Sequence, residues 1–203
     1  MPTQARAFVT RERIMRGAAQ ALSQNGYEGT TIKDILDLTG VTKGALYFHF
    51  SSKDDLARAV LTAQSEWLST VELTGSAAQQ AIDTSYVFGV QLQTDELIRA
   101  SVRLTTEGHG LDDVQRSAFD AWLNAATALC RQAKSEGSLR EGVRPKELAR
   151  TLTASVNGIQ LSSLVYSKYS DIRGRLHDFW KLVAPATFTD EALTSLRLSA
   201  PRK

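Results

Sequence analysis

The stretch Thr31–Lys53, TIKDILDLTGVTKGALYFHFSSK, decides how the surrounding chain folds. Thr31 and Asp34 have the spacing of a capping box, which predicts a helix that begins just after Thr31. Gly40 interrupts the apolar pattern that follows, and glycine accepts the left-handed conformation in which a helix ends. A second short helix is expected over residues 42–48. Two short helices joined by a glycine-containing turn are typical of a helix-turn-helix.

An ordinary helical corner is the alternative, because short helix pairs are common. The composition of the second helix favours DNA binding. It offers a hydroxyl, an ammonium, a phenol and an imidazole, which donate to phosphates and base edges, and a glycine that permits close approach to a groove. We therefore predict DNA contacts in this helix, at the start of the helix before it, and at the start of the helix after it. These residues are Thr31, Lys33, Thr42, Lys43, Gly44, Tyr47, His49 and Lys53.

Several residues of this stretch have a second interpretation, and it stays open. Thr30 and Thr31 precede the first helix, where backbone amides grip phosphates, yet both equally suit a capping role. Lys53 begins the next helix, where a cation is unfavourable unless an anion such as a phosphate meets it. Phe48 and Phe50 are expected to fill the core of a three-helix head.

The segment VTKGALYFHFSSKDDL resembles the recognition helix of the tetracycline-repressor (TetR) family and the residues that follow that helix. The resemblance implies an N-terminal three-helix DNA-binding head, a larger helical body for ligand binding and dimerisation, and a homodimer. We expect a head at residues 1–52, a body at residues 53–198 and a disordered tail at residues 199–203. The residues that carry the match are Lys43-Gly44, Tyr47-x-His49-Phe50 and Lys53.

Helical spacing of apolar residues continues through the chain, and no strand-like alternation exceeds a few residues. We therefore predict an all-α fold of nine or ten helices. Asp171 is expected to cap the last long helix, and Pro185 is expected to end it. The helix after Ser52 joins head to body without a flexible linker, which predicts a mechanical lever. Further expected helices include residues 10–24, 53–72, 77–92, 95–105, 114–134 and 189–198.

The composition is ordinary for a globular protein. Of 203 residues, 42% are hydrophobic and 23% are charged, and no apolar run reaches the length of a membrane span. Cys130 is the single cysteine, which excludes an intrachain disulfide and fits a reducing cytoplasm. The net charge of +2 does not argue for nucleic acid by itself, although four arginines between residues 6 and 16 form a basic arm. We predict a cytoplasmic protein without a signal peptide.

Four segments of the body are similar to the γ-butyrolactone receptor branch of the TetR family: VRLTTEG, FDAWLNA, VNGIQLSS and DIRGRLHDFWKLVAP. This resemblance implies a ligand-responsive repressor that binds a palindromic operator as a dimer. A γ-butyrolactone, butenolide or furan signal would release it, and it would control antibiotic biosynthesis. Pseudo-receptors of the branch bind antibiotics, so a pseudo-receptor or a multidrug-type repressor stays open as the alternative.

The same resemblance suggests residues that bind the signal. The branch places a cavity tryptophan in the AWLNA-like segment, which is Trp122 here, and an indole suits a lactone ring with an alkyl tail. Core packing is the alternative for Trp122. Asn157 stands where threonine is more usual, and an amide both donates and accepts, so the kind of contact stays open. Gln64, Tyr86 and Gln160 are further candidates, each of which also suits a satisfied polar residue near the core.

The sequence argues against an enzyme and against a bound metal. His49, His109 and His177 are far apart, and no base lies close in sequence to Cys130. Glu107 beside His109 is too little for a metal site. We predict no cofactor, with an all-α enzyme as a remote alternative. A nucleoid-type protein without a ligand is disfavoured, because the body is larger and more apolar than a dimerisation patch needs.

The expected partners are double-stranded operator DNA, a small signalling ligand and a second copy of the chain, with no membrane. The two-faced apolar pattern of residues 148–165 and the Phe179-Trp180 pair predict a dimer interface. Two such helices from each subunit would build a symmetric four-helix contact.

Overall fold

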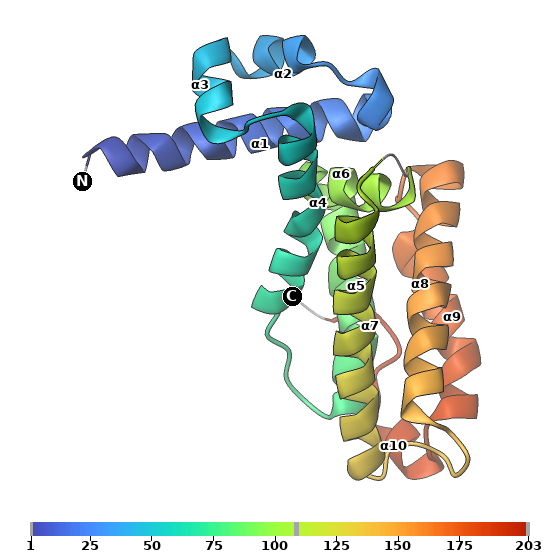
Figure 1. The fold of residues 1–203 in the computed structure, drawn as a ribbon. Helices are drawn as coiled ribbons and strands as arrows, with labels where there is room; N and C mark the ends of the chain where they lie inside the picture. Colours follow the sequence, from blue (N-terminus) through green and yellow to red (C-terminus); the bar gives the residue numbers. More distant parts are fainter. Residues whose placement is uncertain (1, 108–109, 202–203) are drawn as a thin grey trace. The chain divides into compact units, whose positions relative to one another are not determined.

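A computed structural model describes residues 2–107 and 110–201. Within these residues the chain forms ten helices, and its β structure is limited to one isolated bridge between Leu139 and Phe188 (Figure 1). The all-α prediction is confirmed, whereas His109 and residues 202–203 of the predicted tail lie outside the described residues. The helices are α1 (Pro2–Gly29), α2 (Ile32–Thr39), α3 (Lys43–His49), α4 (Lys53–Thr70), α5 (Ala77–Thr94), α6 (Glu96–Thr106), α7 (Asp112–Ser135), α8 (Pro145–Ser167), α9 (Ile172–Thr187) and α10 (Asp190–Ser195).

The chain divides into two compact units. The first contains Met1–Ser69 and Asp95–Phe119, and the second contains Thr70–Thr94 and Asp120–Lys203. The first unit therefore combines the expected head with α6 and nearly all of α4. The predicted functional boundary after residue 52 and the predicted disorder of residues 199–203 stay predictions.

The core of the first unit is built around α1. α2 and α3 pack against α1 (Figure 1). Apolar side chains from these helices, α4 and α6 form one buried cluster. The approach of α1 to α2 depends on Gly17, because a Cβ at that position would lie 2.1 Å from Cγ2 of Thr39. Gly26 has a φ of 72° and a non-helical backbone, so α1 consists of two helical segments that meet at the predicted end, Asn25-Gly26.

The prediction that Phe48 fills the head core is wrong. Its side chain is 79% exposed, whereas Leu46 and Phe50 are buried. Leu46 and Phe50 are four residues apart and share one side of α3. Phe48 lies two residues from each, so the helical period of 3.6 residues turns it to the opposite side.

Two predictions about α9 are also wrong. Pro185 does not end this helix, which continues to Thr187, so the lost amide donor is tolerated within the last turn. Asp171 precedes α9 without a side-chain capping bond. Its carboxylate instead accepts hydrogen bonds from Ser163 and Ser167 of α8, both at 2.6 Å, and from Arg175 of α9 at 2.7 Å. These donors, with Ser163 foremost, lower the pKa of Asp171 to about 2.

In the second unit α8 and α9 pack together, and α5 packs against α9 (Figure 1). Trp180 is buried at the α5–α9 contact, where its Nε1 donates to Oγ of Ser85 at 2.9 Å. A buried indole of this kind needs one acceptor, and Ser85 supplies it. Across the described ranges, no helix combines the length with the apolar character that crossing a bilayer requires.

Candidate DNA-binding surface and signal site

The turn between α2 and α3 has the geometry that its sequence predicts. Oγ1 of Thr31 accepts from the amide of Asp34 at 3.2 Å, and the carboxylate of Asp34 accepts from the amide of Thr31 at 2.8 Å. At the other end of α2, Gly40 has a φ of 64° and donates its amide to Leu36 O at 2.8 Å. The capping box and the left-handed end are both confirmed, and they fix where α2 begins and ends.

α3 presents a polar surface at its N-terminal end. Thr42, Lys43 and Gly44 are exposed, and Tyr47 is 42% exposed. Nζ of Lys43 lies 5.9 Å from the centroid of the Tyr47 ring, one helical turn away. Thr42 Oγ1 accepts from the amide of Ala45 at 3.1 Å, so it caps α3 while its own proton remains able to reach a phosphate.

The threonines before α2 differ from each other. Thr30 is fully buried and donates its hydroxyl to Gly26 O at 2.7 Å, so of its two interpretations the structure favours the local structural one. Thr31 is exposed, but its hydroxyl proton is directed to the carboxylate of Asp34 at 2.7 Å. Lys33, which is exposed on α2, is therefore better placed than Thr31 to donate to a phosphate.

Lys53 is half-buried at the first position of α4. Its Nζ lies 4.2 Å from the centroid of the Tyr27 ring. The ring face offsets part of the cost of holding a cation at a helix N-terminus, without any DNA. Tyr27 in turn donates its hydroxyl to Asp54, and burial followed by this bond raises the pKa of Tyr27 to about 12. The Tyr27 ring therefore holds the Lys53 ammonium at the start of α4.

Sequence reasoning missed Phe48 as a surface residue. Its exposed ring meets the ring of His49 edge-on, with centroids 5.1 Å apart. Counting two residues from the buried Leu46 would have placed it on the outside of α3. Phe48 therefore joins Tyr47 as an exposed aromatic side chain of this short helix.

The candidate signal residues of the second unit lie on three helices. Trp122 is half-buried on α7, and its ring centroid lies 4.5 Å from that of the buried Phe88 on α5. Asn157 is half-buried and Gln160 is buried, both on α8. The structure therefore places the ring of Trp122 in contact with α5. Gln64, the remaining candidate, is buried on α4 in the first unit.

Tyr86 is buried on α5, and its hydroxyl donates to Leu198 O at 2.7 Å. Burial raises the pKa of this phenol to about 12, so it stays a hydrogen-bond donor at neutral pH. A ligand that used the Tyr86 hydroxyl would compete with that backbone carbonyl. The sequence held no sign of this contact, because the two residues are 112 positions apart.

The described residues offer little for nucleophilic or metal chemistry. Cys130 is buried, and burial raises the pKa of its thiol to about 11, which keeps it in the unreactive protonated form. Among the residues that the structure describes, no group of three or more histidine, cysteine, aspartate or glutamate side chains is arranged to hold a metal ion.

A substitution at Gly44 alone tests whether α3 contacts DNA. A Cβ added at Gly44 meets nothing within 4 Å, so Gly44→Ala is expected to stabilise α3 by about 0.5–1 kcal/mol. The same methyl group is expected to weaken operator binding, because it would separate α3 from the groove wall if α3 binds DNA as its sequence predicts. Thermal unfolding and operator titration of this one variant separate the two effects. Unchanged operator affinity would mean that α3 does not approach DNA at this position.

Comparisons with known proteins agree with these features. Residues 14–60 match the family model described as bacterial regulatory proteins, tetR family. The A-factor receptor protein of Streptomyces griseus is 35% identical over 188 residues, which are 92% of this chain and 66% of that protein. The chain thus spans slightly less than two thirds of that relative.

Solved structures give the same result over 94% of the chain. The full-length structure of tylp, a TetR regulator from Streptomyces fradiae, is 36% identical with a TM-score of 0.81, covering 94% of this chain and 92% of that one. A γ-butyrolactone receptor described as ArpA-like is 27% identical with a TM-score of 0.74, covering 94% of this chain and 93% of that one. The likeness therefore extends beyond the helix-turn-helix into the body.

Proposed function

This chain belongs to the TetR family of bacterial transcriptional regulators, and from that premise we propose which DNA and which signal it binds. It is a repressor that binds a palindromic operator as a homodimer, and a small diffusible signal of the γ-butyrolactone, butenolide or furan type releases it. It thereby controls antibiotic biosynthesis, and the protein itself is located in the cytoplasm. The observation that carries the proposal is a resemblance to receptors that covers more than nine tenths of this chain.

Operator recognition is proposed for the exposed end of α3 and its neighbours. Lys43 reaches a base edge or an adjacent phosphate, and Gly44 permits the close approach. Thr42, Tyr47, His49 and Lys53 hold phosphates, with Lys33 and Thr31 at the start of α2. The capping bonds at Thr31 and Thr42 support this proposal because they fix the two helix starts.

Lys53→Ala removes an ammonium group and is expected to weaken binding to every DNA sequence. Each lost phosphate contact lowers the slope of log affinity against log salt by about one unit. Lys43→Ala is expected to relax sequence preference as well, because this residue is proposed to reach a base. Fluorescence titration at several salt concentrations, with an operator selected from random DNA, measures both effects.

Lys146→Ala is the matched control, since it removes an exposed lysine from α8 in the second unit. Lys53→Arg keeps the charge over the Tyr27 ring and is expected to retain most of the affinity. Wild-type affinity and salt slope in both Lys43→Ala and Lys53→Ala would refute the proposed recognition surface.

A homodimer is proposed through α8 and α9. Both helices carry large apolar side chains that are exposed in the single chain, and these residues suit an isologous contact with a second copy. They are Leu161 (57% exposed), Leu164 (38%), Val165 (70%), Tyr166 (80%) and Leu182 (78%).

Sedimentation at micromolar concentration is expected to give twice the chain mass of 22.2 kDa. Val165→Glu buries a charge in the proposed contact and is expected to give monomers that bind the palindrome weakly. Asn124→Glu adds the same charge to an exposed position of α7 and is expected to leave the dimer intact. A monomeric wild type with full operator affinity would rule out the dimer proposal.

Release of the protein from its operator tests the proposed function. The full-length protein is bound to its selected operator and titrated with synthetic γ-butyrolactones, butenolides and furans, and separately with antibiotics. Release by the first set is expected. Release by antibiotics alone would favour the alternative, in which the protein is a pseudo-receptor or a multidrug-type repressor.

A further inference from the structure

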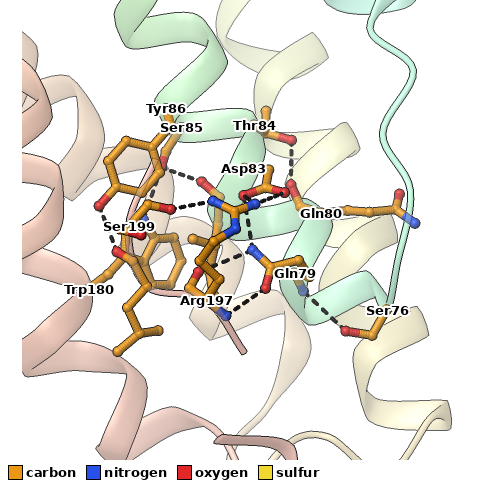
Figure 2. Close-up of polar contacts among 12 residues, drawn as sticks. Ser76, Gln79, Gln80, Asp83, Thr84, Ser85, Tyr86, Trp180, Arg197 and Ser199 are labelled. Carbon is orange, nitrogen blue, oxygen red and sulfur yellow. Dashed lines mark hydrogen bonds and ion pairs between the residues drawn. The ribbon is translucent and has the colours of Figure 1, made fainter. Parts of the chain in front are cut away.

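Residues 196–199, here called the strap, follow α10 and contact the side chains of one face of α5 (Figure 2). Three α5 residues make these contacts, at the spacing that places side chains on one side of a helix. They are Gln79, Asp83 and Tyr86. All of these residues belong to the second unit.

Gln79 recognises the backbone of the strap. Its Oε1 accepts from the amide of Arg197 at 2.8 Å, and its Nε2 donates to the carbonyl of the same residue at 3.1 Å. One side-chain amide thus satisfies both backbone groups of a single residue, as a neighbouring strand would. This pairing requires an extended peptide and is independent of its side chain.

Asp83 recognises the side chain of Arg197. Nη2 of Arg197 donates to both carboxylate oxygens at 2.9 Å, and Nη1 of the same guanidinium donates to Ser199 O. Only 9% of the Asp83 side chain is exposed, against 33% of the Arg197 side chain. A carboxylate so far removed from water requires a cation and further donors. Nε2 of Gln79 supplies one such donor at 2.9 Å.

The next strap residue is held through its carbonyl. Leu198 O accepts from the Tyr86 hydroxyl at 2.7 Å, and Nδ1 of His177 on α9 lies 3.3 Å from the same oxygen. Three side chains of α5 therefore bind successive parts of the strap (Figure 2). Gln79 binds the backbone of Arg197, Asp83 binds its guanidinium, and Tyr86 binds the carbonyl of Leu198. These features together describe a peptide and not an isolated ion pair.

We propose that this face of α5 is a binding site for an extended, arginine-bearing peptide, and that the strap is its resident occupant. The bound peptide uses arginine better than lysine, because two guanidinium nitrogens are engaged at once, one by Asp83 of the site and one by Ser199 O of the strap itself. While the strap is bound, the Tyr86 hydroxyl is engaged. A peptide supplied from outside binds only when the strap has left. This inference holds whether or not the body binds a signal.

Trypsin cleavage after Arg197 measures how often the strap leaves, because cleavage requires a locally opened chain. The full-length protein is digested briefly, and loss of the residues beyond Arg197 is followed by intact mass. Asp83→Asn is expected to speed this loss about tenfold or more, since it leaves the guanidinium without its charge partner. Arg197→Lys keeps a trypsin site and the charge, and it is also expected to be cut faster.

Glu147→Gln is the matched control. It removes an exposed ion pair with Arg144 elsewhere in the second unit and is expected to be cut at the wild-type rate. Thermal unfolding by circular dichroism identifies variants whose whole fold is weakened. Wild-type cleavage rates in both Asp83→Asn and Arg197→Lys would overturn the proposal.

A peptide binding experiment then tests the site directly. A labelled peptide with the sequence of residues 195–201, SLRLSAP, is expected to bind the full-length Arg197→Ala variant and not the wild type. A peptide with alanine in place of its arginine is expected to bind at least about tenfold more weakly. Equal binding of both peptides, or no binding to the Arg197→Ala variant, would refute an arginine-reading site.

Discussion

Replacing Gly17 by alanine is expected to lower the free energy of unfolding of the head by about 1–3 kcal/mol. The new Cβ would lie 2.1 Å from Cγ2 of Thr39, so α1 and α2 would have to separate or Thr39 would have to rotate. Rotation breaks the hydrogen bond from Thr39 Oγ1 to Ile35 O at 2.7 Å. Alanine is favoured over glycine within a helix by only about 0.5–1 kcal/mol, so the overlap decides the sign.

Urea unfolding followed by circular dichroism measures this effect. Gly174→Ala is the control, because that helical glycine of α9 has no heavy atom within 4 Å of an added Cβ, and it is expected to gain stability. Thr39→Ser removes the clashing methyl group and keeps the hydroxyl, so it is expected to restore much of the stability lost in Gly17→Ala. Failure of that rescue would mean that α1 and α2 do not meet at this point.

Replacing Trp122 by alanine is expected to leave operator affinity nearly intact and to make release much less sensitive to the signal. The signal shifts the equilibrium only through its different affinity for the bound and released states. A coupling of about 1–3 kcal/mol per site corresponds to an operator affinity reduced about 5–150-fold, and Trp122→Ala is expected to remove most of it. Operator affinity against signal concentration, for wild type and variant, measures the loss.

Packing of Trp122 against Phe88 provides the competing explanation for any effect of this substitution. Trp122→Phe keeps an aromatic ring against Phe88 and removes the indole donor, so it is the matched control. If Trp122→Ala releases DNA at the same signal concentration as wild type while its melting temperature falls, Trp122 serves the core alone. If Trp122→Phe retains stability but responds weakly, the indole itself contacts the signal.

The sequence by itself determined the all-α class and the helix-turn-helix. For the helix-turn-helix the decisive residues were Thr31 with Asp34 and Gly40, and each acts through backbone groups no more than four residues away. Capping bonds of this kind form wherever the local sequence supports a helix, so they can be predicted without the rest of the molecule. The family resemblance of the recognition helix rests on the same short segment.

Only the tertiary structure decided which of these local groups face outward and what they meet. Thr30 is buried, although its sequence position also allowed an exposed side chain. Lys53 meets the Tyr27 ring, and Tyr86 meets the Leu198 carbonyl 112 residues away. The physical reason is that burial and long-range hydrogen bonds depend on how helices pack, which local periodicity does not specify.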